Sequence, residues 1–150
     1  MIRLQQEPFD LGREYAALKH DHAGIGAIAV FVGTVREQSG DTAISAMTLE
    51  HYPEMTERAL CAIEAEARAR WPLQASLVIH RYGRLAPGDD IVLVMTASAH
   101  RQAALESCAF LIDWLKTKAP FWKREEGASG SHWVAARDED DLAAANWNKP

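Results

Sequence analysis

Apolar residues follow two different rhythms along this chain. Over residues 56–71 and again over 99–118 they return every three or four positions, the spacing of one face of an α-helix. Over residues 27–36 and 91–97 they form nearly continuous runs rich in β-branched side chains, as in buried strands. Helices and strands are therefore expected to alternate along one chain.

Shorter patterns complete the expected order of elements. Strands are expected at 2–4, 27–36, 44–51, 77–83, 91–97, 121–125 and 133–134, and helices at 10–19, 56–71, 99–118 and 138–147. Asp10 and Ser98 are suitable N-caps for the first and third helices. The polar loop 38–42 predicts a hairpin between the strands at 27–36 and 44–51, Pro53 predicts a turn, and 127–130 is expected to be a mobile loop. The mixture predicts an α+β fold with a mixed, mostly antiparallel sheet and flanking helices, in a single domain over residues 1–150.

The composition is that of a soluble protein with enough apolar residues for a core. The 150 residues are 48% hydrophobic and 25% charged, and no apolar run approaches the roughly 20 residues needed to span a membrane. The first residues lack the apolar segment of a signal peptide, so the cytoplasm is the expected location. Cys61 and Cys108 lie on helical patterns and are expected to be small buried side chains. Without a CxxC pair or paired His/Cys spacing, no metal site is expected.

Charge is distributed unevenly over the chain. The net charge of −5 argues against nonspecific binding of nucleic acid, and an acidic cluster occupies residues 138–141. Most basic residues lie instead at the ends of expected elements: Arg36, His80, Arg81, Arg84, His100, Arg101, Lys116, Lys118, Lys123 and Arg124. A local basic pocket in an acidic protein indicates a small anionic ligand.

Residues 115–125 carry four cations around a helix end and the next strand. Lys116 closes the helical pattern, Pro120 breaks it, and Lys123 follows on the expected strand, so both lysines should meet at one place. Aromatic residues lie between them, and partial desolvation is expected for both ammonium groups. A partly desolvated lysine can act as an acid, a base or a nucleophile.

Two further segments have both a functional and a structural interpretation. Gly33 would let a ligand approach the strand that ends in Arg36, but a bulge followed by a surface arginine explains the same residues. His100 and Arg101 follow a strand at the start of a helix, where free backbone N–H groups attract phosphate, or they form a solvated pair. Both alternatives remain open at this point.

Two histidine-containing segments are equally ambiguous. Glu50 and His51 are either an acid–base dyad or residues that fill a strand end, and His80 with Arg81 is expected in mid-strand, equally suited to the sheet surface. The chain has no Walker loop, no GxGxxG after a strand, no GxSxG and no HExxH. Nucleotide hydrolysis, dehydrogenase chemistry and metalloprotease chemistry are therefore disfavoured.

Five segments, in order, resemble the large, catalytic subunit family of molybdopterin synthase, the MoaE family. They are residues 31–36 (FVGTVR), 49–56 (LEHYPEMT), 79–83 (IHRYG), 98–101 (SAHR) and 115–125 (LKTKAPFWKRE). The resemblance runs from about residue 8 to residue 147, and its last segment is the most specific.

The resemblance implies an α/β hammerhead fold and a sulfurtransferase acting in molybdenum cofactor biosynthesis. Sulfur would come from the C-terminal Gly-Gly thiocarboxylate of a small ubiquitin-like subunit and go to cyclic pyranopterin monophosphate, forming the dithiolene of molybdopterin. A homodimer of this chain would bind one small subunit at each end, as a heterotetramer. No metal or other cofactor is implied. The alternatives are a noncatalytic scaffold that binds the partner's tail and a regulator that binds a small anion.

The resemblance also assigns roles to residues of this chain. Lys116 and Lys123 are the catalytic pair, with Lys116 beside the thiocarboxylate and Lys123 on the substrate. The implied substrate-binding set is Thr34, Val35, Arg36, His100, Arg101, Lys116, Lys123, Arg124 and Glu125. His100 and Arg101 would come from the neighbouring protomer. Phe31 and Ile112 would line the pocket, although Ile112 stands where the family often has methionine.

Overall fold

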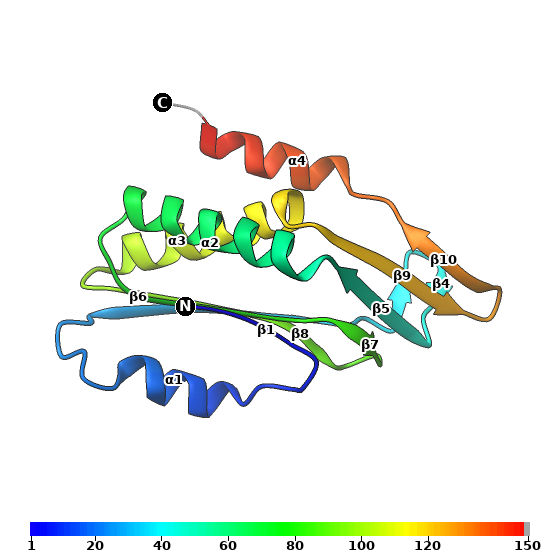
Figure 1. Ribbon diagram of the computed structural model, residues 1–150, viewed down its shortest axis with the longest axis horizontal. Coiled ribbons are helices and arrows are strands. Elements are labelled where there is room, and N and C mark those ends of the chain that lie inside the picture. The colour runs from blue at the N-terminus through cyan, green and yellow to red at the C-terminus, as the bar shows by residue number, and fades with distance from the viewer. Residues whose placement is uncertain (149–150) are drawn as a thin grey trace.

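Long apolar strands build the first of two sheets in the computed structural model, which describes residues 1–148 (Figure 1). Its order is β1-β6-β8-β2, with β1 parallel to β6 and the other neighbours antiparallel. The strands are β1 (Ile2–Gln5), β6 (Leu73–Arg81), β8 (Asp90–Ser98) and β2 (Ala27–Thr34).

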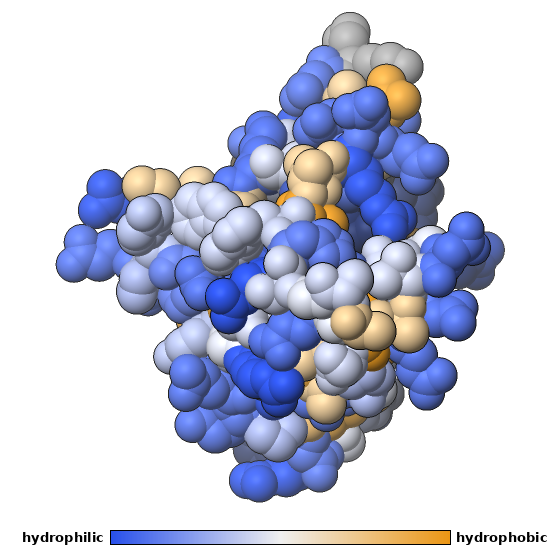
Figure 2. Space-filling view, turned by 90° about the vertical axis from the view of Figure 1, so that its right-hand side faces the viewer, coloured by the Kyte–Doolittle hydropathy of each residue, from blue (hydrophilic) through white to orange (hydrophobic). Residues whose placement is uncertain are grey.

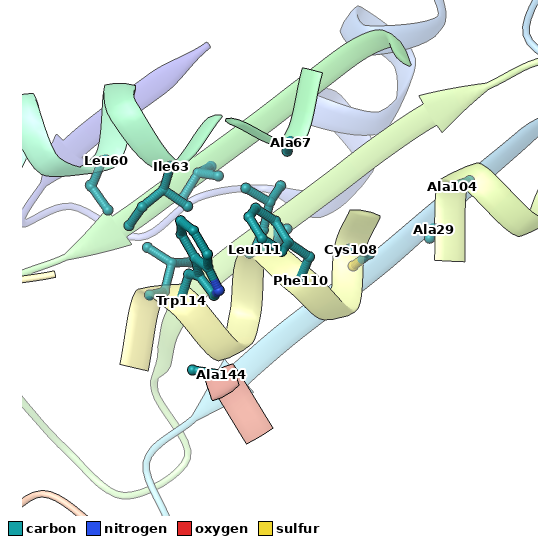
Figure 3. Packing of buried hydrophobic residues seen from close by; sticks show 13 residues of the cluster. Ala29, Leu60, Ile63, Ala67, Ala104, Cys108, Phe110, Leu111, Trp114 and Ala144 are labelled. Atoms are coloured by element: carbon teal, nitrogen blue, oxygen red, sulfur yellow. The ribbon is translucent and has the colours of Figure 1, made fainter. Parts of the chain in front are cut away.

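Helices cover both faces of this sheet, which explains its continuous apolar runs. Helices α2 (Pro53–Arg70) and α3 (Arg101–Lys118) pack on the face that presents Val78 and Val94. Figure 3 shows Ile63 of α2 and Trp114 of α3 in this core. The opposite face presents Leu77, Ile79, Leu93 and Met95, and α1 (Leu11–Lys19) contributes Leu18 to their cluster.

A second, fully antiparallel sheet extends to one side of the first (Figure 1). Its order is β10-β9-β5-β7. The strands are β10 (Gly130–Val134), β9 (Phe121–Gly127), β5 (Ala46–His51) and β7 (Gly83–Leu85). Beyond it, α4 (Asp138–Ala145) and a short 3-10 helix (Asn146–Asn148) return over α3. The predicted α+β class, with mostly antiparallel strands and flanking helices, is confirmed.

The predicted hairpin between the strands at 27–36 and 44–51 is wrong. Strand β2 pairs with β8 in the first sheet, whereas β5 pairs with β7 and β9 in the second. The polar loop closes a small hairpin of its own, β3 (Gln38–Ser39) with β4 (Thr42–Ala43). Proximity in the chain favoured the hairpin. The apolar side chains of β2 are better buried, however, when the strand pairs inside the helix-covered sheet.

Several expected element ends also differ from the structure. Pro53 occupies the first turn of α2 instead of a separate turn, because proline needs no N–H partner there. Ser98 does not cap α3: its hydroxyl donates to the carbonyl of Pro72 at 2.9 Å, and His100 is the N-cap residue. Residues 127–130 form the turn of the β9–β10 hairpin, where Gly130 has a φ of 106°.

The two cysteines differ in burial. Cys108 is buried as predicted, but Cys61 is exposed, so its predicted burial is wrong. Within residues 1–148 no helix is both long and apolar enough to cross a membrane.

A single domain over 1–150 stays a prediction, and residues 149–150 lie outside the described part of the chain.

Candidate active site

A cavity of about 550 Å³ opens where the two sheets meet the C-terminal end of α3. Figure 2 shows the end of the molecule that carries the second sheet, a mostly hydrophilic surface broken by small hydrophobic patches. The apolar side chains that line the cavity include Phe31 and Ile112, which the resemblance assigned to the pocket. The charged and polar side chains of the cavity are Thr34, Arg36, His80, Lys116, Lys123, Glu125, Arg137 and Asp140. The cavity thus combines an apolar wall with a cluster of cations.

Strand alternation decides which residues of β9 reach this cavity. Phe121, Lys123 and Glu125 point into it, because alternate residues of a strand share one face. Arg124 lies on the other face, where its guanidinium carbon is 5.7 Å from the ring centre of Trp133. The structure therefore does not bring Arg124 to the cavity that holds Lys123.

The two lysines that the sequence singled out do converge on the cavity. Lys116 Nζ lies 3.4 Å from Oδ1 of Asp140, and Lys123 Nζ lies 3.7 Å from Oε1 of the buried Glu125. His132 approaches the second oxygen of Glu125 at 3.9 Å. The Lys123 side chain is 34% exposed and the Lys116 side chain 55%, so the expected desolvation is present at Lys123 and slight at Lys116.

The segment after β2 divides its residues between the cavity and the core. Thr34 and Arg36 line the cavity with exposed side chains. Val35 is buried against Met47 and Leu49, its N–H donates to Asp89, and its carbonyl accepts from Gly88. Both backbone groups of Val35 have partners within the chain, and its side chain packs in the core, so Val35 is not part of the cavity wall.

His100 and Arg101 do not line the cavity of their own chain. They begin α3, whereas Lys116 lies in its last turn, about 23 Å away along the helix axis. Gly26 holds this end in place: its N–H donates to Ser98, and a Cβ there would lie 2.2 Å from the carbonyl oxygen of Ala99. Within one chain, the exposed His100 and Arg101 therefore lie far from the cavity that contains Lys116.

Sequence reasoning missed several residues of the cavity wall. Arg137 and Asp140 come from the acidic C-terminal region, whose role the sequence left undefined. His80 was assigned to mid-strand, equally suited to the sheet surface, but its ring stacks on Phe121 with centres 3.9 Å apart. Desolvation by burial lowers the pKa of His80 to about 4 and also lowers the pKa of His51. A histidine within an otherwise apolar strand was the available sequence signal.

No group of three or more potential ligands within residues 1–148 is arranged to hold a metal ion. The ionisable side chains of the cavity are cations, two ion-paired carboxylates and the imidazole of His80. These groups can bind an anion and move a proton.

Comparison with known proteins gives these features a context. The MoaE protein family model matches residues 4–118. The "Molybdopterin synthase catalytic subunit" of Pseudomonas aeruginosa is 52% identical over 148 residues, covering 99% of each chain.

Solved structures agree with this assignment. The "Molybdopterin biosynthesis MoaE protein" from Burkholderia ambifaria has a TM-score of 0.85 and 51% identity, covering 100% of this chain and 99% of that one. A "Protein-protein complex of subunit 1 and 2 of Molybdopterin-converting factor" from Helicobacter pylori has a TM-score of 0.75 over 91% of each chain, and its 22% identity shows the fold alone. The family match, the near-complete coverage and the shared fold establish that the chain belongs to the MoaE protein family.

Proposed function

We propose that this chain is the catalytic subunit of a molybdopterin synthase. It transfers sulfur from the C-terminal thiocarboxylate of a small ubiquitin-like subunit to cyclic pyranopterin monophosphate, and so forms the dithiolene of molybdopterin. The observation that carries the proposal is the convergence of Lys116 and Lys123 on one cavity of about 550 Å³. The cytoplasm is the compartment in which we place this reaction.

The charges of the cavity suit the two anions that must meet in it. Arg36, Lys116, Lys123 and Arg137 supply positive charge around a space that fits a small heterocycle. Glu125 and Asp140 each lie within 4 Å of one lysine and hold it at a defined place. A monophosphate and a thiocarboxylate would find compensating charge there without any metal ion.

We assign the two lysines different tasks. Lys116 is more exposed and stands where α3 ends, so it suits the thiocarboxylate of an incoming peptide tail and stabilises charge on the acyl group. Lys123 is more enclosed and is held by the buried Glu125, so it suits the bound pterin and proton transfer at its side chain. Thr34 at the end of β2 and Arg36 just after it complete the substrate contacts.

The proposal includes a symmetric dimer. His100 and Arg101 are exposed on the end of α3 away from the cavity, and they contribute to catalysis only if a partner protomer turns that end toward Lys116. One small subunit at each end would complete a heterotetramer. The Helicobacter pylori neighbour, which shares this fold, is named as a complex of two subunits.

Reconstitution tests the proposed reaction. The chain is mixed with a thiocarboxylated small subunit and cyclic pyranopterin monophosphate, and dithiolene formation is followed, with an unmodified carboxylate partner as the control. Product that requires the thiocarboxylate supports the enzyme. Partner binding without product supports the noncatalytic scaffold, and binding of the pterin alone supports an anion-binding regulator.

A further inference from the structure

We propose that His80 is a positioning residue of the cavity: its Nε2 accepts a hydrogen bond from an N–H donor on the heterocycle of the bound pterin. This inference rests on the proposed function and adds to it how the uncharged part of the substrate is recognised. The cations of the cavity explain how an anion is held, but they do not orient a ring.

The strand position of His80 and its stacking on Phe121 define its location. It is the penultimate residue of β6, on the same face as the buried Val78, and it lines the cavity where that face ends. Its ring lies nearly parallel to that of Phe121, with an interplanar angle of 17°, and the ring of His51 packs against the same Phe121 ring with centres 5.7 Å apart. The imidazole therefore has a defined plane and little freedom to rotate.

One hydrogen bond fixes the tautomer of this ring. His80 Nδ1 lies 2.9 Å from the carbonyl oxygen of Arg81, and a carbonyl can only accept, so Nδ1 carries the proton. In the neutral ring Nε2 then holds a lone pair. Among residues 1–148, the buried side-chain atoms without a partner belong to Arg3, His51, Trp114 and Arg124, and Nε2 of His80 is not one of them. The His80 side chain is half-buried and lines the cavity.

The rest of the cavity makes a free acceptor valuable. The side chains of Arg36, Lys116, Lys123 and Arg137 only donate hydrogen bonds, and Glu125 and Asp140 already face lysines. The uncharged acceptors of the lining side chains are the Thr34 hydroxyl and the imidazole of His80. A pterin carries donor N–H groups on its ring and acceptor oxygens on its phosphate. The cations suit the phosphate, and His80 Nε2 suits the donor edge of the ring.

Burial explains why His80 serves as an acceptor and not as a proton carrier. Desolvation lowers its pKa to about 4, so the ring stays neutral at physiological pH. A base this weak contributes little to proton transfer near neutral pH, whereas its lone pair remains available throughout.

Nitrogen NMR of the complete protein tests the assignment directly. With ¹⁵N-labelled histidine, and His80→Gln to identify the resonance, we expect a protonated Nδ1 and an unprotonated Nε2 in the free protein. Cyclic pyranopterin monophosphate should shift Nε2 and leave Nδ1 in place. A proton on Nε2, or a titration in which substrate binds without moving the Nε2 signal, would overturn the inference.

Kinetics supply an independent readout. His80→Leu should raise the KM for the pterin about ten-fold with kcat and partner binding retained, and His80→Gln, whose amide oxygen accepts, should recover most of the loss. The exposed His22→Leu serves as the control. A fall in kcat with unchanged KM would contradict a positioning role. If the wild-type protein forms no dithiolene, the proposed function fails separately, and the NMR titration with pterin still decides the role of His80.

Discussion

Lys116 Nζ lies 3.4 Å from Oδ1 of Asp140, an ion pair that joins the last turn of α3 to the first turn of α4 beside the cavity. The pair gives the acidic C-terminal region a definite place in the site. Because the lysine side chain is more than half exposed, water screens the attraction, and the pair orients Lys116 more than it stabilises the fold.

Lys116 and its neighbour Lys118 should respond to substitution in opposite ways. Lys116→Ala should abolish most sulfur transfer and change the free energy of unfolding by less than about 1 kcal/mol. Lys118 Nζ lies 3.4 Å from the ring centre of Trp114 and does not line the cavity. Lys118→Ala should therefore keep activity and lose about 0.5–1 kcal/mol of stability. Denaturant titration and the reconstituted assay measure both quantities; equal activity loss in the two variants would contradict the assignment.

Lys123 should matter for both stability and activity. Lys123→Ala leaves the buried Glu125 carboxylate with only the distant His132, which should cost about 1–3 kcal/mol. Adding Glu125→Gln removes the unpaired charge, so the double variant should regain stability without regaining activity. Arg124→Ala, on the other face of β9, is the matched control for activity. A double variant as unstable as Lys123→Ala would show that the ion pair is not the cause.

A shared site between two protomers predicts complementation. Arg101→Ala and Lys116→Ala chains should each be inactive, but a heterodimer of the two contains one cavity with both native residues. Random mixing should then restore about a quarter of wild-type activity, because half of the dimers carry one intact site of two. Activity is measured after the two variants are unfolded and refolded together. No recovery, with heterodimers demonstrated, would place Arg101 outside the site.

Stability should fall in mild acid because of His80. The unfolded chain binds a proton near pH 6.5, whereas the folded ring resists protonation until about pH 4. The unfolded state therefore holds more protons in this window, and the free energy of unfolding decreases as the pH falls through it, by an amount on the order of 3 kcal/mol. Denaturant titrations across the window should show a flatter pH dependence for His80→Phe than for wild type. The same flattening in the exposed His22→Phe would refute the attribution.

The two cysteines should differ in reactivity without affecting sulfur transfer. Burial raises the pKa of the Cys108 thiol to about 11, whereas Cys61 is exposed on α2. Iodoacetamide should thus alkylate Cys61 and spare Cys108 in the folded protein, as measured by peptide mass spectrometry. A Cys61→Ser/Cys108→Ser variant should still form the dithiolene. Loss of transfer in a folded double variant would indicate a persulfide route.

Local sequence patterns predicted the positions of helices and strands better than they predicted which strands pair with each other. Helical spacing located α2 and α3, and apolar runs located β2 and β8, because burial of one face acts within a short window. Strand pairing depends on contacts distant in sequence, and for that reason β2 and β5 were joined in a hairpin that does not exist.

The site shows the same difference between local arrangements, which the sequence predicted, and long-range ones, which it did not. Lys116 and Lys123 were predicted to meet because a helix end and the following strand bring them together locally. His80 and Asp140 reach the cavity through sheet pairing and the return of α4 over α3, and both arrangements depend on contacts between residues distant in sequence. Arg124, which the resemblance placed in the substrate-binding set, lies on the other face of β9, because neighbouring residues of a strand point to opposite faces.

The most direct test of the account is a single-turnover assay with thiocarboxylated partner and cyclic pyranopterin monophosphate. Wild type, Lys116→Ala and Lys123→Ala are compared with Lys118→Ala and Arg124→Ala, after partner binding has been confirmed for each. The account requires dithiolene formation in the wild type and in the two controls, and a large loss in both cavity variants. Full activity in Lys116→Ala and Lys123→Ala would contradict it.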